Sequence, residues 1–266
     1  MPRLAANLSM LFTDVPFLDR FARAARAGFA AVECQFPYEH PPAELRARLE
    51  AHGLSLVLHN LPPGDWAAGE RGIACHPSRV AEFEAGVQQS IEYATVLGCG
   101  QLNCLAGLVP RDVGSERARA TLVRNLGYAA EQTKAAGIRL LLEPINTRDM
   151  PGYLVTRTRD ARAIMHDVGS ENLFLQFDCY HMQIMDGDLA RALEANLDTI
   201  AHIQVADPPA RTEPGTGDID FPAIFDLLDR LDYRGWIGCE YTPVGRTEDG
   251  LGWARQYLPG NRDGGG

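Results

Sequence analysis

Residues 139–146 read Arg-Leu-Leu-Leu-Glu-Pro-Ile-Asn, in which an apolar run of three leucines is followed by the acidic side chain of Glu143. A continuous apolar run without alternation is typical of a strand that is buried on both faces, as the strands of parallel sheets are. Glu143 directly follows three leucines, and a charged side chain at the end of a buried strand costs free energy unless it is paired or functional. The stretch therefore predicts a parallel-sheet strand with a functional group at its carboxyl end.

The same pattern recurs along the whole chain. Helical patterns separate the strand candidates, and the strand-then-helix units average about 33 residues each, close to what a βαβ unit needs. The predicted strands cover residues 4–12, 30–36, 55–61, 101–106, 139–145, 173–181, 200–206 and 236–241. Between them, Pro42 marks the start of one helix and Gly53 its end, Gly98 ends another, and Asp220 is the predicted N-cap of a third.

Eight such units favour an α/β fold made of a single (β/α)₈ TIM barrel, whose active site lies where the strands end. The alternative is an open, doubly wound sheet, which has the same alternation of strands and helices. A Rossmann-type sheet usually carries Gly-x-Gly-x-x-Gly after its first strand, whereas Thr-Asp-Val-Pro stands at residues 13–16 here. We therefore predict one barrel over residues 1–258 and a flexible C-terminal tail over residues 259–266.

Four successive predicted strands end in oxygen-bearing side chains. These are Glu143, Asp178, Gln204 and Glu240, and in a barrel the carboxyl ends of neighbouring strands converge on one axis. Three carboxylates held together repel one another, so some must take up protons or share a cation. Two glutamates, one aspartate and one amide oxygen form a ligand set that suits Mg²⁺ or Mn²⁺ better than structural zinc.

Each of these residues alone has a simpler interpretation. A single glutamate late in a strand can be paired with an arginine, and Gln204 can hydrogen-bond the backbone within the core. His202, two residues before Gln204 and on the same face, is predicted to be a core histidine rather than a ligand. Equivalent positions on four consecutive strands favour the functional interpretation.

The composition excludes several classes of function. The 25 basic residues against 35 acidic ones give a formal net charge of −10, which argues against binding to nucleic acids or anionic membranes. Lys134 is the single lysine, so a Gly-Lys-Ser/Thr phosphate loop is absent and Schiff-base catalysis has one candidate, which we place away from the strand ends. Six cysteines without a CxxC pair, and an N-terminus without a signal-peptide pattern, predict a cytoplasmic location.

The motifs near the predicted strand ends also carry a family resemblance. They lie at residues 58–66, 69–73, 142–146, 177–181, 202–207, 213–219 and 238–241. On these stretches the chain resembles the hydroxypyruvate isomerase family, within the larger xylose-isomerase-like barrel superfamily, over nearly its whole length. Gly-Glu-Arg-Gly-Ile at 69–73 and the glutamine at position 204 are the more specific features, since the sugar epimerases generally carry histidine at that position.

The resemblance implies a metal ion held by Glu143, Asp178, Gln204 and Glu240, with the two glutamates also acting as the acid/base pair. His181, three residues after Asp178, matches the superfamily's substrate-contacting histidine. The other implied substrate-binding residues are His59 at the end of the third predicted strand, Glu70 and Arg71 in the loop that follows it, and Arg211 after the seventh.

The implied activity is the interconversion of hydroxypyruvate and tartronate semialdehyde through an enediol. This reaction requires a base, an acid, and positive charge on the developing oxyanions, which Mg²⁺ or Mn²⁺ can supply. The alternative is a 2-oxo-tetronate isomerase or a ketose 3-epimerase of the same superfamily. Their chemistry and metal ligands would be almost the same, so only the size of the substrate pocket distinguishes these activities from hydroxypyruvate isomerisation.

A nuclease of the endonuclease IV type needs a histidine-rich metal cluster and a basic groove, which the charge of −10 disfavours. The expected partner is a small hydroxy-oxo acid or sugar, with no nucleic acid and no membrane. A homo-oligomer would be ordinary for such a barrel.

Two loops near the predicted site carry weaker signals. Gly215 and Gly217, within residues 213–219, either form an anion-binding nest or make a tight connection into the next helix. The tight connection is favoured, because no helix N-terminus directly follows the glycines. Residues 146–154 are predicted to form a lid beside Glu143.

Overall fold

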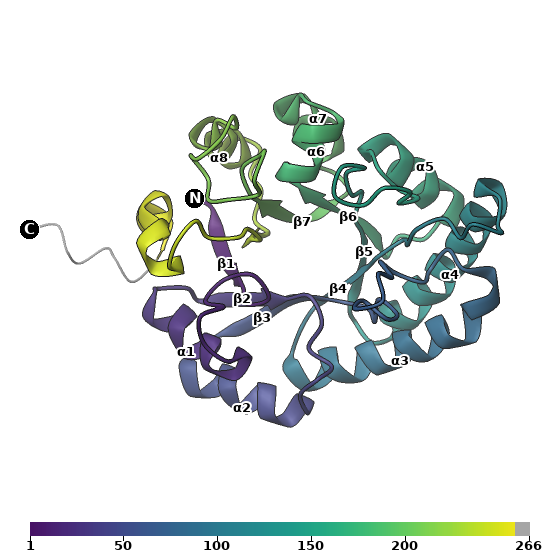
Figure 1. Cartoon of the computed structure of the whole chain (residues 1–266), viewed down its shortest axis with the longest axis horizontal. Helices are drawn as coiled ribbons and strands as arrows, with labels where there is room; N and C mark the ends of the chain where they lie inside the picture. The colour runs from purple at the N-terminus through teal and green to yellow at the C-terminus, as the bar shows by residue number, and fades with distance from the viewer. Residues whose placement is uncertain (259–266) are drawn as a thin grey trace, which may run out of the picture.

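The computed structural model describes residues 1–258, which form a closed barrel of eight parallel strands surrounded by helices (Figure 1). The strands are β1 (Arg3–Asn7), β2 (Ala31–Cys34), β3 (Ser55–Asn60), β4 (Gln101–Cys104), β5 (Arg139–Leu142), β6 (Leu173–Asp178), β7 (Ile200–Val205) and β8 (Trp236–Cys239). They follow one another around the barrel in chain order, and β8 pairs with β1 to close it. The predicted (β/α)₈ barrel is confirmed. The tail predicted over residues 259–266 lies outside the described residues.

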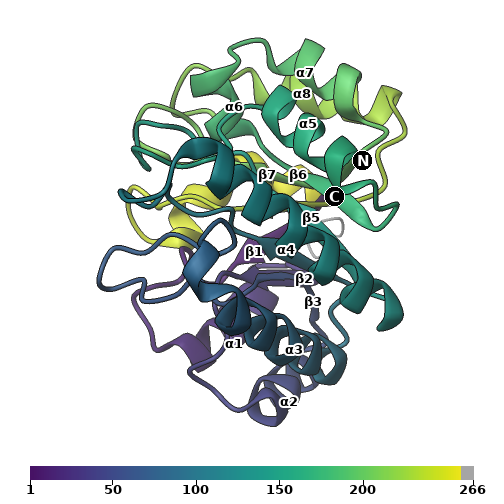
Figure 2. The same cartoon turned by 90° about the vertical axis from the view of Figure 1, so that its right-hand side faces the viewer.

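Helices cover the outside of the barrel (Figure 2). They are α1 (Phe17–Arg26), α2 (Pro42–His52), the 3₁₀ turn η1 (Pro77–Arg79), α3 (Val80–Leu97), α4 (Ser115–Ala135), α5 (Thr158–Val168), α6 (Cys179–Met185), α7 (Leu189–Asn196), α8 (Phe221–Arg230) and the 3₁₀ segment η2 (Thr247–Tyr257). Gly53 and Gly98 adopt the left-handed conformation directly after α2 and α3, and the Asp220 carboxylate accepts a hydrogen bond from the Ala223 backbone at the start of α8. These helix boundaries are as predicted.

The strands end earlier than the sequence predicts, because turns begin directly after them. The prediction of a strand over residues 173–181 was wrong at its carboxyl end, since β6 stops at Asp178. The Asp178 carboxylate accepts hydrogen bonds from the backbone N–H groups of Tyr180 (2.8 Å) and His181 (3.4 Å), and so acts as the N-cap of α6. His181 therefore lies in the first turn of a helix. The other predicted strands also extend past the observed ones into the loops.

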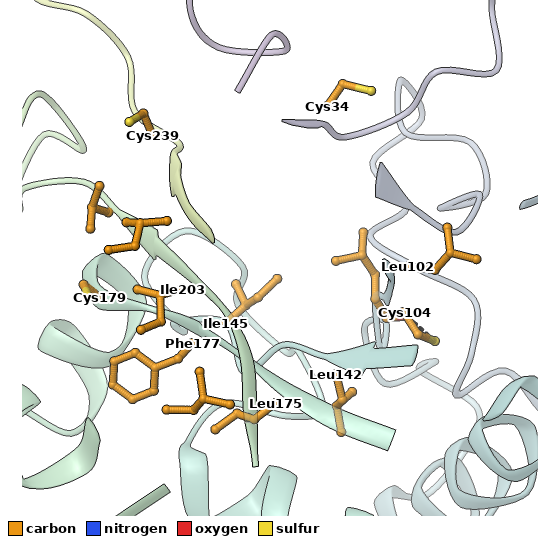
Figure 3. Packing of buried hydrophobic residues seen from close by; sticks show 14 of the residues in the cluster. Cys34, Leu102, Cys104, Leu142, Ile145, Leu175, Phe177, Cys179, Ile203 and Cys239 are labelled. Carbon is orange, nitrogen blue, oxygen red and sulfur yellow. Dashed lines mark hydrogen bonds between the residues drawn. The ribbon is translucent and has the colours of Figure 1, made fainter. Parts of the chain in front are cut away.

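Side chains alternate between the barrel interior and the apolar layer beneath the helices. Leu142, Phe177, Ile203 and Cys239 belong to the outer layer, where Figure 3 shows Phe177 and Ile203 close to each other. Because successive side chains of a strand point to opposite faces, the residues that follow these four point into the barrel. This alternation directs the polar strand-end residues inward.

All six cysteines are buried and free, and Cys34, Cys104 and Cys239 lie on strands, whereas Cys179 begins α6. Lys134 lies in the last turn of α4, where it forms an ion pair with Glu171. Within residues 1–258, no helix has both the length and the apolar character that crossing a membrane requires.

Two glycines bring the loops after β3 and β4 into backbone contact at the carboxyl end of the barrel. Gly72 and Gly107 have φ angles of 107° and 100°. A Cβ atom at Gly72 would lie 2.5 Å from the carbonyl oxygen of Leu105, and one at Gly107 would lie 2.5 Å from the carbonyl oxygen of Gly72. Only glycine permits both this conformation and this approach, which explains the second glycine of the Gly-Glu-Arg-Gly-Ile motif.

We expect Gly72→Ala to lower the free energy of unfolding by roughly 3 kcal/mol or more, because backbone strain and steric overlap add together. The matched control is Gly53→Ala, where φ is 63° and a Cβ atom meets nothing within 4 Å, so backbone strain alone should cost about 1–2 kcal/mol. Urea denaturation of both variants measures the difference. Equal losses would contradict the assigned loop contact.

Candidate active site

Three buried carboxylates converge at the carboxyl end of the barrel. Glu143 follows β5, Asp178 ends β6 and Glu240 follows β8, and each side chain is almost fully buried. Nη2 of Arg211 lies 3.2 Å from Oδ2 of Asp178 and 2.6 Å from Oε2 of Glu240. The oxygens of two strand ends therefore face one shared cationic group.

Neutral amides donate hydrogen bonds to both glutamates. Nδ2 of Asn103 donates to Oε2 of Glu143 (3.0 Å). Oε1 of Glu240 accepts from Nδ2 of Asn7 (3.1 Å) and from Nε2 of Gln35 (3.0 Å). These contacts hold the two carboxylates in place without adding charge to the site.

Burial raises the pKa of all three carboxyl groups. Desolvation raises the pKa of Glu143 well above its usual range, and the charges of Glu240 and Asp178 raise it further. Desolvation raises the pKa of Glu240 to about 7 although Arg211 opposes the shift, and it raises the pKa of Asp178 against the same opposition. Near neutral pH the site therefore favours a bound proton or a further cation, which is the property needed for proton transfer.

Arg211 reaches the carboxylates from the loop after β7. Its backbone adopts a φ of 56°, a conformation that is uncommon outside glycine, and its carbonyl oxygen accepts a hydrogen bond from Thr242 N (2.9 Å). The guanidinium lies 5.2 Å from the ring centre of Tyr180. Although burial alone would lower the pKa of Arg211, the charges of Glu240 and Asp178 raise it. The side chain thus stays cationic in the site.

His181 lies beside the same carboxylates. Its Nε2 is 3.5 Å from Oδ2 of Asp178 and 3.8 Å from Oε1 of Glu143, and its Nδ1 is 2.7 Å from Nδ2 of Asn146. Burial lowers the pKa of His181 well below its usual value. One potential ligand atom from each of Glu143, Asp178 and His181 lies within 4.8 Å of the others, so these three residues can hold a metal ion. This group overlaps only partly with the four ligands expected from the sequence.

Gln204 lies on β7 opposite Asp178 of β6. Its Nε2 donates to Oε1 of Glu33 (2.8 Å), and its Oε1 accepts from Nε2 of Gln176 (2.7 Å). An amide oxygen has two lone pairs, so one remains for a cation. Its role as a metal ligand remains a prediction that this geometry permits.

A fourth acid, Glu33, is as deeply buried as the three predicted acids, although it was not among the predicted site residues. Glu33 accepts hydrogen bonds from Asn7 (2.9 Å) and Gln204, and its Oε2 lies 2.6 Å from Nε2 of His202. His202 is a core histidine in a buried pair, as expected. The signal for Glu33 was the same as that for Glu143: an acid within an apolar strand.

The structure does not bring His59 to the carboxylate cluster. Nδ1 of His59 lies 3.3 Å from the Tyr38 hydroxyl and 3.2 Å from the carbonyl oxygen of Asn60. Burial lowers the pKa of His59 to about 4, so the ring is uncharged near neutral pH. Its role in substrate binding remains a prediction, but it cannot supply positive charge to an anion.

Glu70 and Arg71 lie in the loop after β3, and their observed contacts are with that loop and η1. Glu70 forms an ion pair with Arg79 and accepts a hydrogen bond from Asp65 N (2.5 Å). The Arg71 guanidinium lies 4.1 Å from the ring centre of Trp66. Trp66 lines a groove of about 680 Å³ together with Phe36, Tyr38 and Pro62, among others. Arg71 thus supports one wall of this groove.

The glycine-rich loop at residues 213–219 is closed on a carboxylate of the chain itself. Asp207 accepts hydrogen bonds from Gly215 N (2.8 Å) and Ile219 N (3.1 Å). A Cβ atom at Gly217 would lie 1.9 Å from the carbonyl oxygen of Pro208. The loop therefore forms the tight connection that the sequence favoured, with Asp207 in the place of an external anion.

The chain resembles known proteins in both sequence and fold. A family model described as a xylose isomerase-like TIM barrel matches residues 21–257. The chain is 53% identical to the 2-oxo-tetronate isomerase of Cupriavidus necator, with 97% of this chain and 99% of that protein covered. It is 50% identical to the hydroxypyruvate isomerase of Escherichia coli, with 97% and 100% covered. A crystal structure titled AP endonuclease, family 2, from Brucella melitensis has a TM-score of 0.95 at 44% identity, with 97% and 100% covered.

The raised pKa of Glu240 gives the metal-free protein a pH dependence of stability. A carboxyl group with a raised pKa in the folded state stabilises the fold fully below its ordinary value of 4.5 and loses that contribution as the pH rises through about 7. The side chain introduced by Glu240→Gln cannot ionise. As the pH rises from 4.5 to 7, we therefore expect the free energy of unfolding of the variant to increase relative to that of wild type by on the order of 1–3 kcal/mol.

Urea denaturation of metal-free protein across this pH range measures the effect. Glu50→Gln, which removes an exposed carboxylate paired with Arg46, is the control for the loss of an acidic side chain. A pH-independent difference between wild type and Glu240→Gln would contradict the shift.

Proposed function

The chain belongs to the xylose isomerase-like TIM barrel family, and on that premise we propose that it interconverts hydroxypyruvate and tartronate semialdehyde. The relatives in Cupriavidus necator and Escherichia coli confirm the resemblance to the hydroxypyruvate isomerase family, and both are named isomerases. Their names support the broader class of small hydroxy-oxo acids as substrates. The protein is accordingly an isomerase, and the specific acid and mechanism are what we propose here.

The observation that carries the proposal is the convergence of Glu143, Asp178 and Glu240 around the guanidinium of Arg211. A proton-transfer enzyme needs groups that can hold a proton near neutral pH and release it. Burial gives the two glutamates this property, since it raises the pKa of both. A site that only bound a ligand would not need two such carboxyl groups.

Glu143 and Glu240 act as the acid/base pair in this proposal. In the forward direction one removes a proton from C3 of hydroxypyruvate to form an enediol, and the other delivers a proton to C2. The hydroxyl proton passes from O3 to O2, so the substrate gains and loses no proton overall. The two glutamates end with exchanged protonation states and return to their starting states by proton exchange with water. Asn103 and Asn7 keep the two carboxylates oriented through their hydrogen bonds.

Arg211 and His181 provide the contacts that an anionic substrate requires. Arg211 carries positive charge next to Asp178 and Glu240, so it can pair with the carboxylate of a hydroxy-oxo acid. His181 faces the space beside Glu143 and Asp178, where a substrate oxygen can meet it. Arg71, His59 and Glu70 remain proposed substrate-binding residues whose observed contacts lie in the surrounding loops.

The buried donors fit a divalent cation. The carboxylates of Glu143, Asp178 and Glu240, with the amide oxygen of Gln204, would hold it, and an all-oxygen set suits Mg²⁺ or Mn²⁺. When bound, the ion supplies positive charge to the developing oxyanions of the enediol. The same carboxylates already share the positive charge of Arg211, which is consistent with a cation-binding centre.

The second candidate is a 2-oxo-tetronate isomerase, which the 53% identity to the Cupriavidus necator enzyme favours. Such an enzyme carries out the same proton transfer on a four-carbon acid. A ketose 3-epimerase, the remaining alternative, would act on a free ketose. The name of the Brucella melitensis protein points to a nuclease, but a net charge of −10 makes such a function unfavourable for this chain. We also propose that the enzyme is cytoplasmic and that it binds neither nucleic acid nor a membrane. A homo-oligomer is the expected assembly, since such assemblies are common among soluble enzymes.

We expect Glu143→Gln and Glu240→Gln each to lower kcat by roughly a hundredfold to ten-thousandfold, because each removes one proton-transfer group. Circular dichroism should show the barrel intact, and Glu50→Gln on the exposed face of α2 serves as the control with unchanged kcat. Near-normal turnover in both active-site variants would rule out the acid/base assignment.

The substrate class is tested by measuring kcat/KM for hydroxypyruvate, 2-oxo-tetronate and free ketoses. We expect hydroxypyruvate to have the highest kcat/KM. A higher kcat/KM for 2-oxo-tetronate would assign the second candidate function.

We also expect a chelator to lower the turnover of hydroxypyruvate until Mg²⁺ or Mn²⁺ is restored. Full activity in verified metal-free protein would remove the cation from the mechanism.

A further inference from the structure

We propose that Asn146 is a positioning residue that holds His181 in its Nε2–H tautomer, so that His181 donates a hydrogen bond to the substrate and does not ligate the metal ion. The proposal deepens the proposed function and rests on it for the identity of the acceptor. His181 is a predicted substrate-binding residue, whereas Asn146 was not among the predicted site residues. Asn146 lies in the loop after β5, and His181 lies in the first turn of α6.

The amide of Asn146 can point in only one direction. Its Oδ1 accepts hydrogen bonds from the backbone N–H groups of Arg148 (2.9 Å) and Asp149 (2.8 Å). Its Nδ2 donates to Oδ2 of Asp149 (3.1 Å) and lies 2.7 Å from Nδ1 of His181. Reversing the amide would set its oxygen against a carboxylate and its NH₂ group against two N–H donors. The backbone of the loop therefore fixes which atom faces His181.

This orientation decides the protonation of the imidazole. An amide nitrogen donates and cannot accept, so Nδ1 of His181 must present its lone pair to Asn146. An imidazolium ring has a hydrogen on both nitrogens and is excluded by the same contact. A neutral ring with an unprotonated Nδ1 carries its hydrogen on Nε2.

The Nε2–H group points toward the predicted reaction centre. Nε2 lies 3.5 Å from Asp178 and 3.8 Å from Glu143, both longer than the ~3 Å of an ordinary N–H···O hydrogen bond. A substrate oxygen between these carboxylates can accept this hydrogen. A metal ligand, in contrast, needs a lone pair on the coordinating nitrogen.

The tautomer thereby separates two possible ligand sets. Glu143, Asp178 and His181 lie close enough to hold a metal ion, but a protonated Nε2 removes the imidazole from that set. The remaining donors are oxygens, which favour Mg²⁺ or Mn²⁺ over metals that prefer imidazole. A single amide in a neighbouring loop thus affects both substrate contact and metal preference.

The wild-type protein tests the tautomer directly. Two-bond ¹H–¹⁵N correlation spectra of metal-free, ¹⁵N-histidine-labelled full-length protein distinguish protonated from unprotonated ring nitrogens, and a His181→Gln variant identifies the His181 signals among the seven histidines. We expect a protonated Nε2 and an unprotonated Nδ1. A protonated Nδ1, alone or together with Nε2, would overturn the proposal.

The role of Asn146 is tested by Asn146→Asp in an Asp149→Asn background. The background replacement avoids a clash of two carboxylates, and Asp149→Asn alone is the matched parent, since Asp149 is not in hydrogen-bond contact with His181. The introduced carboxylate can only accept, so the hydrogen should move to Nδ1 and leave a lone pair on Nε2. The parent should keep the wild-type tautomer, and an unchanged tautomer in the double variant would overturn the positioning role.

Metal preference gives a second readout that needs no substrate. Calorimetric titrations with Zn²⁺ and Mg²⁺ should show the Zn²⁺-to-Mg²⁺ affinity ratio rising roughly tenfold or more from the parent to the double variant. The ratio cancels the general effect of the added negative charge. An unchanged ratio would contradict the exclusion of His181 from the ligand set. Because neither measurement uses a substrate, failure of the proposed substrate preference would leave both results interpretable.

Discussion

Three carboxylates buried at the ends of β5, β6 and β8 impose the constraint on which the rest of this site depends. Removing an ionised carboxylate from water costs several kcal/mol, and neighbouring negative charges add to that cost. Arg211 offsets part of it by lying between Asp178 and Glu240. The loop after β7 accepts an unfavourable φ of 56° at Arg211. The pKa values of Glu143 and Glu240 stay raised nonetheless, because Arg211 compensates only part of the buried negative charge. The uncompensated charge makes the site suitable for binding protons and cations.

Amide side chains organise the space around these charges. An amide has one donating and one accepting end, so each contact with a carboxylate sets the direction of the other end. Asn103 is oriented in this way by Glu143, and Gln204 by Glu33. These hydrogen bonds fix the orientation of the buried carboxylates without adding charge to the barrel interior. Asn146 applies the same principle to His181, with backbone N–H groups in place of a carboxylate.

The division between strands and loops matches the division of chemical roles. The acid/base candidates Glu143 and Glu240 stand directly at the ends of buried strands. Arg211, Asn146 and the loop with Trp66 belong to the connections at the carboxyl end of the barrel. In barrels of this kind the loops distinguish related substrates, while the strand ends keep the chemistry. This is consistent with one family containing enzymes named for a three-carbon and a four-carbon acid.

The sequence alone determined the barrel and the acids at its strand ends, because both follow from local patterns. Apolar runs such as residues 139–142 specify buried strands, and a charged residue such as Glu143 after such a run stands out against its neighbours. Glu33 carried the same signal and could have been found. The tertiary structure decided which groups meet: Arg211 reaches Asp178, whereas His59 contacts Tyr38. It also decided the direction of each amide and the tautomer of His181. These depend on contacts between residues distant in sequence, whose register no local pattern encodes.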